Sequence, residues 1–245
     1  MNFYSSISEN YDQIFPFKPP VLAFVMNYLL DPDRKRILDI GCGSGRLALE
    51  LAQKGFAVDA IDYDRDMIAL TERKMHSLSA GGKLRFQRMD MQLLIENFES
   101  GSFDSVLCFG NTLVHLTTLK KIDDFIGSLS MLLKKDGHLM VQILNYDYIL
   151  TEKISSLPLI ENDKIKFERY YDYPDGELIN FRTILTIKKT NRIIHNSIGL
   201  YPLQKMDLDL ILGDHHFTNI DYFGSFLMDD LKADSLPLVV HAVKQ

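Results

Sequence analysis

The sequence is poor in the residues that mark several specialised classes of protein. Its 245 residues include two cysteines, Cys42 and Cys108. Both fall at or near the ends of predicted strands, where we expect reduced packing residues. No internal repeat and no low-complexity segment is present.

Positive charge is not in excess either. The 27 lysine and arginine residues are outnumbered by 33 aspartate and glutamate residues, which leaves a formal charge of -6. Binding to nucleic acid depends on clustered basic residues, so this balance disfavours a nucleic-acid partner and favours a small or neutral substrate. The densest basic run, Asp33-Arg-Lys-Arg36, is interpreted as a solvated edge.

Long apolar segments are missing as well. The N-terminus, Met1-Asn-Phe-Tyr-Ser-Ser, lacks the basic start and apolar core of a signal peptide, and no stretch is long enough to cross a bilayer. We therefore expect a cytoplasmic protein without a membrane partner. With 46% hydrophobic residues, the chain can bury one large core, which predicts a single domain over residues 1–245.

Apolar strand patterns alternate with helical patterns through the first 144 residues. Alternation of this kind predicts a mostly parallel sheet with helices on both faces and ligands at the carboxyl ends of the strands. The predicted strands are 36–40, 57–62, 84–88, 103–108 and 137–144, and the predicted helices are 45–54, 65–78 and 119–133, with a shorter one at 91–98.

The pattern changes after Asn145. Three strand-like segments, 164–173, 178–188 and 192–201, are joined by short polar turns, which predicts an antiparallel β insertion over 160–202. A helix at 203–213 and strands at 216–224 and 238–243 then predict a C-terminal antiparallel hairpin on the main sheet, giving seven strands in a Rossmann-like arrangement. Residues 1–33 are predicted to form a helical lid, broken by prolines.

A glycine-rich turn lies between the first strand and the first long helix, in Asp39-Ile-Gly-Cys-Gly-Ser-Gly-Arg46. Glycines allow both a tight turn and the close approach of a ligand to the main chain. A dinucleotide fingerprint requires a small residue where Arg46 stands, so a pyrophosphate ligand is disfavoured. Asp39 supports the same conclusion, because a carboxylate suits a cationic ligand better than a phosphate.

This turn resembles motif I of the class I S-adenosylmethionine-dependent methyltransferases. The resemblance implies S-adenosylmethionine as the cofactor, with its amino acid portion over the loop formed by Gly41, Cys42, Gly43 and Gly45. A structural glycine-rich turn in another α/β protein is the alternative.

Asp62 closes the second strand, 62 − 41 = 21 residues beyond the first glycine, where an acid usually binds the ribose hydroxyls of a nucleotide. Tyr63 and Met67 follow it and could cover one face of an adenine ring, although ordinary core packing would explain them equally well. Asp64 is expected to cap the next helix.

Two residues at the end of the third strand are assigned by the same resemblance. In methyltransferases an acid here commonly accepts a hydrogen bond from the adenine amino group, and the next main-chain N–H binds a ring nitrogen, which implies Asp90 and Met91. A turn-initiating aspartate is the alternative for Asp90.

The segment from Phe103 to Leu116 ends in Gly110-Asn-Thr-Leu-Val-His-Leu116 and resembles the fourth-strand motif of the small-molecule branch that includes the glycine N-methyltransferases. The resemblance implies that the Phe109 carbonyl binds the amino group of the cofactor. It also implies that Asn111, Thr112 and His115 line the cavity beneath the reactive methyl group. His115 is a candidate general base because its ordinary pKa is near neutrality, and a helix-start histidine bonded to the backbone is the alternative.

Two further regions bear on the substrate. Tyr11 belongs to an aromatic N-terminal segment that resembles the cofactor-covering helix of the family, and it could contact the acceptor. In the insertion, Arg169 and Arg182 could bind a substrate carboxylate or could belong to a solvated sheet face. Asp214, His215 and His216 do not have the spacing of a metal site, so no metal is expected.

The sequence thus predicts a methyltransferase that acts on a small molecule, preferably on an amine nitrogen, as a monomer or homodimer. Two alternatives remain open: a methyltransferase acting on protein or RNA, and a catalytically idle cofactor-binding regulatory protein.

Overall fold

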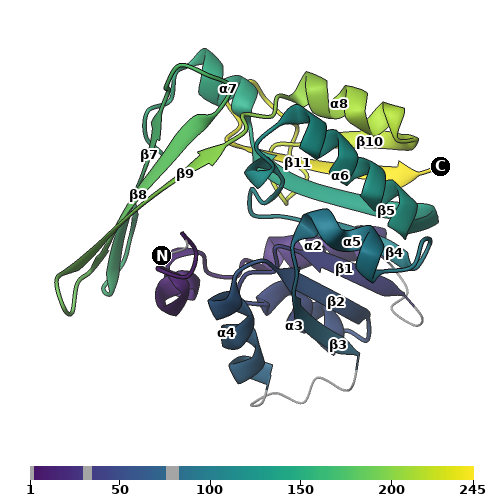
Figure 1. Cartoon of the computed structure of the whole chain (residues 1–245), viewed down its shortest axis with the longest axis horizontal. Helices are drawn as coiled ribbons and strands as arrows, with labels where there is room; N and C mark the ends of the chain where they lie inside the picture. The colour runs from purple at the N-terminus through teal and green to yellow at the C-terminus, as the bar shows by residue number, and fades with distance from the viewer. Residues whose placement is uncertain (1–2, 30–34, 76–82) are drawn as a thin grey trace.

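A computed structural model describes residues 3–29, 35–75 and 83–245 of the chain. Its main element is a seven-stranded sheet with the order β10-β11-β5-β4-β1-β2-β3 (Figure 1). The strands are β1 (Arg36–Ile40), β2 (Ala57–Asp62), β3 (Leu84–Arg88), β4 (Phe103–Cys108), β5 (Leu133–Leu144), β10 (Phe217–Phe223) and β11 (Pro237–Lys244).

Strands β1 to β5 pair in parallel, while β11 is antiparallel to both β5 and β10. The predicted seven-stranded, mostly parallel sheet with a C-terminal antiparallel hairpin is therefore confirmed. Parallel strands need covered faces, and successive side chains of β4 enter separate cores: Val106 packs on one side of the sheet and Leu107 on the other.

Helices cover both faces of this sheet. Helices α2 and α3 supply apolar side chains to one core, and α5, α6 and α8 supply them to the other. The helices are α2 (Pro19–Tyr28), α3 (Arg46–Gln53), α4 (Arg65–Met75), α5 (Leu94–Asn97), α6 (Leu119–Leu132) and α8 (Lys205–Asp214). Among them, none is long and apolar enough to cross a membrane.

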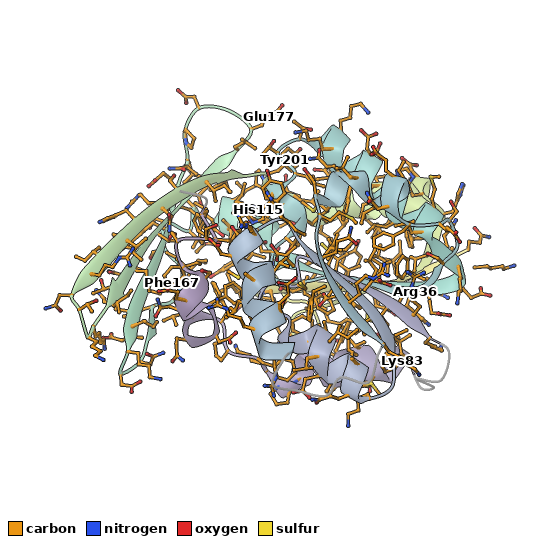
Figure 2. All side chains as sticks on the ribbon, turned by 60° about the horizontal axis from the view of Figure 1, so that its bottom comes forward. Arg36, Lys83, His115, Phe167, Glu177 and Tyr201 are labelled. Carbon is orange, nitrogen blue, oxygen red and sulfur yellow. The ribbon has the colours of Figure 1, made fainter. Side chains whose placement is uncertain are left out.

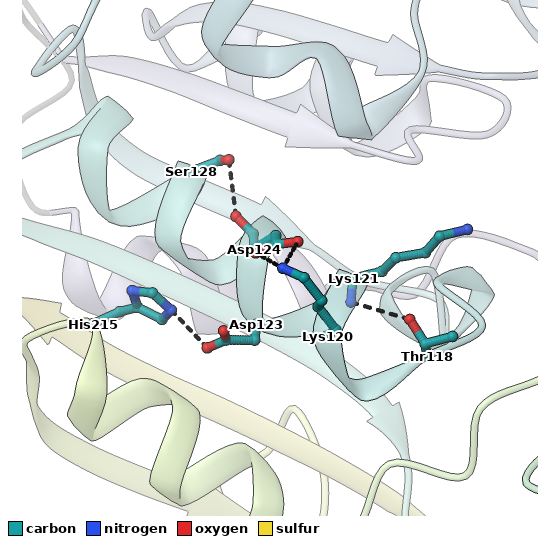
Figure 3. Close-up of polar contacts among 7 residues, drawn as sticks. All are labelled: Thr118, Lys120, Lys121, Asp123, Asp124, Ser128 and His215. Atoms are coloured by element: carbon teal, nitrogen blue, oxygen red, sulfur yellow. Dashed lines mark hydrogen bonds and ion pairs between the residues drawn. The ribbon is translucent and has the colours of Figure 1, made fainter.

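Hydrogen bonds and ion pairs connect polar side chains along α6 and join this helix to the end of α8 (Figure 3). The Thr118 hydroxyl caps the helix by accepting a hydrogen bond from the Lys121 N–H, and Lys120 pairs with Asp124 one turn away. Asp123 Oδ1 lies 2.8 Å from Nε2 of His215, the residue after α8. His215 thus joins two helices. No three His, Cys, Asp or Glu side chains within the described ranges are grouped to hold a metal ion.

The insertion forms a second sheet that projects from the main body, as Figure 1 shows, with the order β6-β7-β8-β9. Its strands are β6 (Ile160–Glu161), β7 (Ile165–Asp172), β8 (Ile179–Ile187) and β9 (Arg192–Leu200), all antiparallel. Two short N-terminal helices, η1 (Ser8–Asn10) and α1 (Tyr11–Ile14), pack against its inner face, where Ile7 and Ile14 join Phe167 and Leu185 in a third apolar cluster.

Three features differ from the sequence prediction. Strand β5 begins at Leu133 rather than at residue 137, and its pairing with β4 shifts register near Phe103, so Lys134–Gly137 belong to an irregular strand rather than to a turn. Helix α7 (Tyr146–Thr151) follows β5 directly because the Asn145 side chain caps it, accepting from the Tyr148 N–H. Strand β6 has two residues and no sequence signal.

A few predicted positions cannot be compared. Residues 30–33 of the predicted lid, 76–78 of the predicted helix and the first two residues of the basic run lie outside the described residues.

Candidate active site

The glycine turn lies at the carboxyl end of β1, and its three glycines all have positive φ angles of 69°, 55° and 72°. At Gly43 a Cβ atom would lie 2.8 Å from the Tyr11 hydroxyl oxygen, and at Gly41 it would clash with Thr112. At Gly45 a Cβ would meet the ring of Phe86, 2.6 Å away. Glycine is therefore required at each position for two reasons: the φ angle is positive, and a Cβ atom would clash with a neighbouring side chain.

Asp62 connects this turn to the next strand end. Its two carboxylate oxygens accept hydrogen bonds from the N–H groups of Gly43, at 2.9 Å, and Asp64, at 2.8 Å. Burial raises the pKa of Asp62 to about 6, although the two backbone hydrogen bonds oppose the shift. Asp39 is buried below the turn, where burial and the Asp62 charge raise its pKa to about 7.

These residues border a cavity of about 290 Å³ at the carboxyl ends of β1 to β4. Figure 2 shows His115 between the insertion sheet and the main sheet, with Arg36 and Lys83 far away, beside the first residues of β1 and β3. The cavity therefore lies where the α/β topology predicts a ligand. Its lining contains Gly41, Gly43, Asp62, Tyr63, Met67, Asp90, Met91, Phe109, Thr112, His115 and Tyr11.

Tyr63 and Met67 form one side of the cavity, with Met67 buried and Tyr63 59% exposed. Asp90 and Met91 form another side, and Asp90 also caps the short helix η2 (Met91–Leu93) by accepting from the Gln92 N–H at 2.9 Å. The position of Asp90 is thus compatible with both interpretations drawn from the sequence: an aspartate that begins a turn, and an acid that accepts a hydrogen bond from the adenine amino group.

The opposite end of the cavity is closed by residues from three distant segments. His115 follows β4, Tyr4 comes from the N-terminal segment and Ile198 comes from β9. Tyr4 Oη and His115 Nε2 lie 2.8 Å apart. Burial lowers the pKa of His115 to about 4 and raises that of Tyr4, so both side chains are neutral near pH 7.

The N-terminal segment is held by three consecutive side chains. Tyr4 contacts His115, the Ser5 hydroxyl donates to Asp64 at 2.7 Å, and Ser6 Oγ accepts from Asn196 of β9 at 2.6 Å. One short stretch of chain therefore connects the loop after β4, the start of α4 and the insertion sheet. The sequence indicated an aromatic lid that includes Tyr4 and favoured Tyr11 as its contact; Ser5 and Ser6 were not singled out.

Four predicted site residues are not among those that line the cavity: Asp39, Cys42, Gly45 and Asn111. Asn111 has a φ of 66°, accepts from the Leu144 N–H at 2.9 Å and donates to the Tyr146 hydroxyl at 3.0 Å, so it joins the loop after β4 to β5 and α7. Cys42 is partly buried within the glycine turn, and burial raises the pKa of its thiol. The Phe109 carbonyl accepts the Thr112 hydroxyl at 2.7 Å.

Arg169 and Arg182, the two arginines of the insertion considered for a substrate carboxylate, lie away from the cavity wall. Arg182 pairs with Asp172, at 3.2 Å, and Arg169 donates to the Pro158 carbonyl at 2.7 Å. Neither residue is among those that line the cavity. Arg169 and Thr183 are cross-strand partners, so Arg169 does share a sheet face with Tyr171, as the alternation predicts.

A parallel sheet with a glycine turn after β1 and a carboxylate ending β2 defines an α/β protein that binds a nucleoside-containing cofactor. Residues 37–137 match the family model described as a methyltransferase domain. We identify this segment, which contains the glycine turn, Asp62, Asp90 and His115, as the methyltransferase domain of an S-adenosylmethionine-dependent enzyme.

Curated relatives include the glycine/sarcosine N-methyltransferase of Aphanothece halophytica, 25% identical over 91% of this chain and 80% of the relative. The putative methyltransferase YqeM of Bacillus subtilis is 32% identical over 46% of this chain and 43% of its own length. A solved methyltransferase from Clostridium acetobutylicum has the same fold, with a TM-score of 0.81, 18% identity and 99% of each chain covered.

The described residues fit this cofactor. A side chain at Gly43 would meet the Tyr11 ring, and Asp62, which lines the cavity, could accept hydrogen bonds from the ribose hydroxyls of a bound nucleoside. The cavity is bordered by Asp62, Asp64 and Asp90 and, within the described ranges, by no lysine or arginine, which suits a ligand that carries positive charge. S-Adenosylmethionine supplies a methyl group on a positively charged sulfur.

Proposed function

We propose that this methyltransferase transfers the methyl group to the amine nitrogen of a small molecule. The observation that carries the proposal is the neutral His115, which faces the cavity in contact with Tyr4 and has a pKa lowered to about 4. A weak base of this kind cannot ionise an alcohol or a phenol. An amine attacks through its lone pair once its ammonium form has released a proton to solvent; the S–C bond breaks as the N–C bond forms, and the methylated amine then returns its extra proton to solvent.

The small size of the acceptor is supported by the volume of the cavity. The cavity of about 290 Å³ lies just below the roughly 300–1,000 Å³ usual for small-molecule sites and has to take the cofactor as well, and residues of the N-terminal segment and of β9 border it. A protein or RNA segment would require these elements to move apart. The glycine/sarcosine N-methyltransferase relative also supports a small amine.

Within this proposal the protein acts mainly by orientation. Tyr4 and His115 would hold the acceptor nitrogen in line with the methyl group, and alignment of two reactants can account for roughly 7–11 kcal/mol of the barrier. The apolar side chains of Leu116 and Ile198 would exclude water from the same end of the cavity. His115, first considered as a general base, is proposed here as a neutral hydrogen-bonding partner.

Transfer of a labelled methyl group tests the proposal. The purified protein is incubated with labelled cofactor and fractions of a metabolite extract, and the methylated product is identified by mass spectrometry and by its response to acid hydrolysis. An N-methylated small molecule is expected. An O-methylated product, or label found only in protein or RNA, would contradict the proposal. Cofactor binding with no transfer would support the idle alternative.

A further inference from the structure

The charge of the cavity lining carries information about the acceptor as well as the cofactor. All the formal charges on this lining are negative, at Asp62, Asp64 and Asp90. Of the residues that the structure describes, no lysine or arginine borders the cavity. His115 adds no positive charge, because its pKa is lowered to about 4 by burial.

Backbone donors do not replace the missing cations at the acceptor end. The N–H of Gly110 donates to Gln142 Oε1 at 2.9 Å, that of His115 to the Thr112 carbonyl and that of Leu116 to the Leu113 carbonyl, both at 3.1 Å. These three backbone N–H groups of the loop after β4 are thus already used in hydrogen bonds within the protein. The side chains left to meet an acceptor are aromatic hydroxyls, one neutral imidazole and aliphatic groups.

The arginines that could have supplied a positive charge are engaged elsewhere. Arg182 lies in an ion pair with Asp172, and the guanidinium of Arg169 contacts the Pro158 carbonyl at the edge of β7. Arg169 borders a separate cavity, together with Tyr148 and Leu157, and not the one that contains His115. Neither arginine is placed to bind an acid group beside the reacting nitrogen.

An amino acid acceptor would be poorly matched to this environment. S-Adenosylmethionine offsets its own carboxylate with an ammonium and a sulfonium group. An amino acid, in contrast, reacts with its amine uncharged, so its carboxylate carries a net negative charge. Only the cofactor would supply positive groups beside that charge, because the described residues that border the cavity include three aspartates and no lysine or arginine, and a buried charge that the protein leaves unpaired is costly.

We infer that the acceptor is an amine without a carboxylate on the carbon next to the reacting nitrogen. That carbon carries uncharged groups instead, such as alkyl, ring or hydroxyl substituents. This inference rests on the proposed function and narrows its substrate class. It separates this chain from relatives whose names specify glycine, although their sequences are similar.

The first test uses matched pairs of amines with labelled cofactor. Glycine is compared with glycinamide, and phenylalanine with phenethylamine, and the same protein is supplied with a metabolite extract whose N-methylated product is identified. We expect each carboxylate-free partner to have a higher kcat/KM by at least about tenfold, which is the effect of roughly one unpaired charge interaction. An extract product without a carboxylate beside the methylated nitrogen would agree.

The outcomes separate the two proposals. Equal or faster methylation of glycine and phenylalanine, or an N-methylated amino acid as the extract product, would overturn this inference and leave amine methylation intact. An O-methylated product, or no transfer to any compound, would overturn the proposed function, and the inference would fall with it.

A second test adds the missing charge. Ile198→Lys places an ammonium on β9 at the cavity wall, and Ile198→Met is the matched neutral control of similar length. We expect the lysine variant to shift the kcat/KM ratio of glycine to glycinamide toward glycine by about tenfold, and the methionine variant to leave the ratio unchanged. Thermal unfolding verifies that both variants are folded, and an unchanged ratio in a folded lysine variant would contradict the inference.

Discussion

The two ends of the cavity are built in different ways. The cofactor end comes from the ends of neighbouring strands, and its key contacts join residues close in sequence, such as Asp62 to Asp64 and, across 19 residues, Asp62 to Gly43. The acceptor end joins Tyr4 to His115 across 111 residues, and Ser6 to Asn196 across 190.

This difference separates a part of the cavity that is set by the topology of the sheet from a part that is made by additional segments. The first end needs a glycine turn and an acid at the next strand end, both of which a parallel α/β sheet places together. The second depends on where the N-terminal segment and the insertion happen to pack. Changes at the first end should alter cofactor affinity, and changes at the second should alter turnover.

The largest effect is expected from Gly43→Val. A side chain here must adopt a positive φ and would also intrude on Tyr11 and on the cofactor space. Cofactor affinity, measured by calorimetry, should fall at least about 100-fold, given roughly 1–2 kcal/mol of backbone strain in addition to the lost space. Gly101→Val is the matched control, because Gly101 has a φ of 62° with no atom within 4 Å of its Cβ position. Similar loss in both variants would assign the effect to strain alone.

Asp62→Asn should weaken cofactor binding by about 10–100-fold, because a hydrogen bond to a charged group contributes roughly 1.5–3 kcal/mol. The Gly43 and Asp64 N–H groups lose a charged acceptor as well. Asp175→Asn, on the exposed turn between β7 and β8, should leave affinity unchanged. Unaltered affinity in Asp62→Asn would contradict the ribose assignment.

The pH dependence of cofactor binding also tests the cofactor end of the cavity. In the free protein the pKa of Asp39 is raised to about 7 and that of Asp62 to about 6, so both carboxyls carry protons at lower pH. A cationic ligand favours their charged forms, and binding should therefore release protons. Affinity should rise by about five- to tenfold between about pH 6 and about pH 8.

Calorimetry in buffers of different ionisation enthalpy measures this proton release directly. S-Adenosylhomocysteine, which lacks the sulfonium charge, is the control ligand and should release fewer protons. Asp39→Asn should also reduce the release. Equal release with both ligands would show that the acids do not respond to the positive sulfur.

Tyr4→Phe tests the acceptor end. Loss of the contact between Tyr4 Oη and His115 should lower kcat by about fivefold, since a neutral hydrogen bond contributes roughly 1 kcal/mol, while cofactor affinity stays the same. Tyr170→Phe is the control, because its hydroxyl bonds Glu168 rather than a residue of the cavity. A fall in cofactor affinity with unchanged kcat would reverse the assignment of the two ends.

The pH profile of kcat provides an additional readout for this pair. Because the pKa of His115 is lowered to about 4, a neutral His115 predicts no loss of kcat as the pH falls from about 8 to about 6. An inflection near pH 6.5 that disappears in His115→Asn would instead assign His115 as a base with an ordinary pKa.

The smallest effect is expected away from both ends. Asp123→Asn weakens the contact to His215 that joins α6 to the end of α8, which Figure 3 shows as a dashed line. The pair is partly exposed, so the free energy of unfolding should fall by no more than about 1 kcal/mol, measured by denaturant titration. Cofactor affinity and kcat should not change. A change in either would indicate that the helix layer controls the cavity.

Most of the main sheet could be predicted from the sequence because its strands are short apolar runs between amphipathic helices. β1, β2, β3 and β4 have the predicted bounds. Strand β5 was predicted too short because Lys-Lys-Asp-Gly resembles a turn, and only its pairing with β4 and β11 extends it. Helix α7 was missed because a short helix after Asn145 has too few residues for a periodic signal.

At the site, the spacing of residues within short motifs predicted more of the cavity residues than the overall composition did. The glycine turn, Asp62, Asp90 and His115 are all found at the cavity. The contact of Tyr4 with His115 and the place of Ile198 at the cavity could not have been predicted, because both come from packing between segments that no sequence period relates. Asn111 was identified from its motif, but the structure shows it holding the loop after β4 to Leu144 and Tyr146.

The sequence by itself determined the fold class and the cofactor of this protein, because a glycine turn, a strand-end acid and an alternating apolar pattern are local features with local physical causes. Only the tertiary structure decided what surrounds the acceptor. There Tyr4, His115 and Ile198 meet, Arg169 and Arg182 lie elsewhere, and burial leaves His115 uncharged. Burial and contact between distant segments depend on the whole packed chain, and these two quantities set the charge and shape that an acceptor meets.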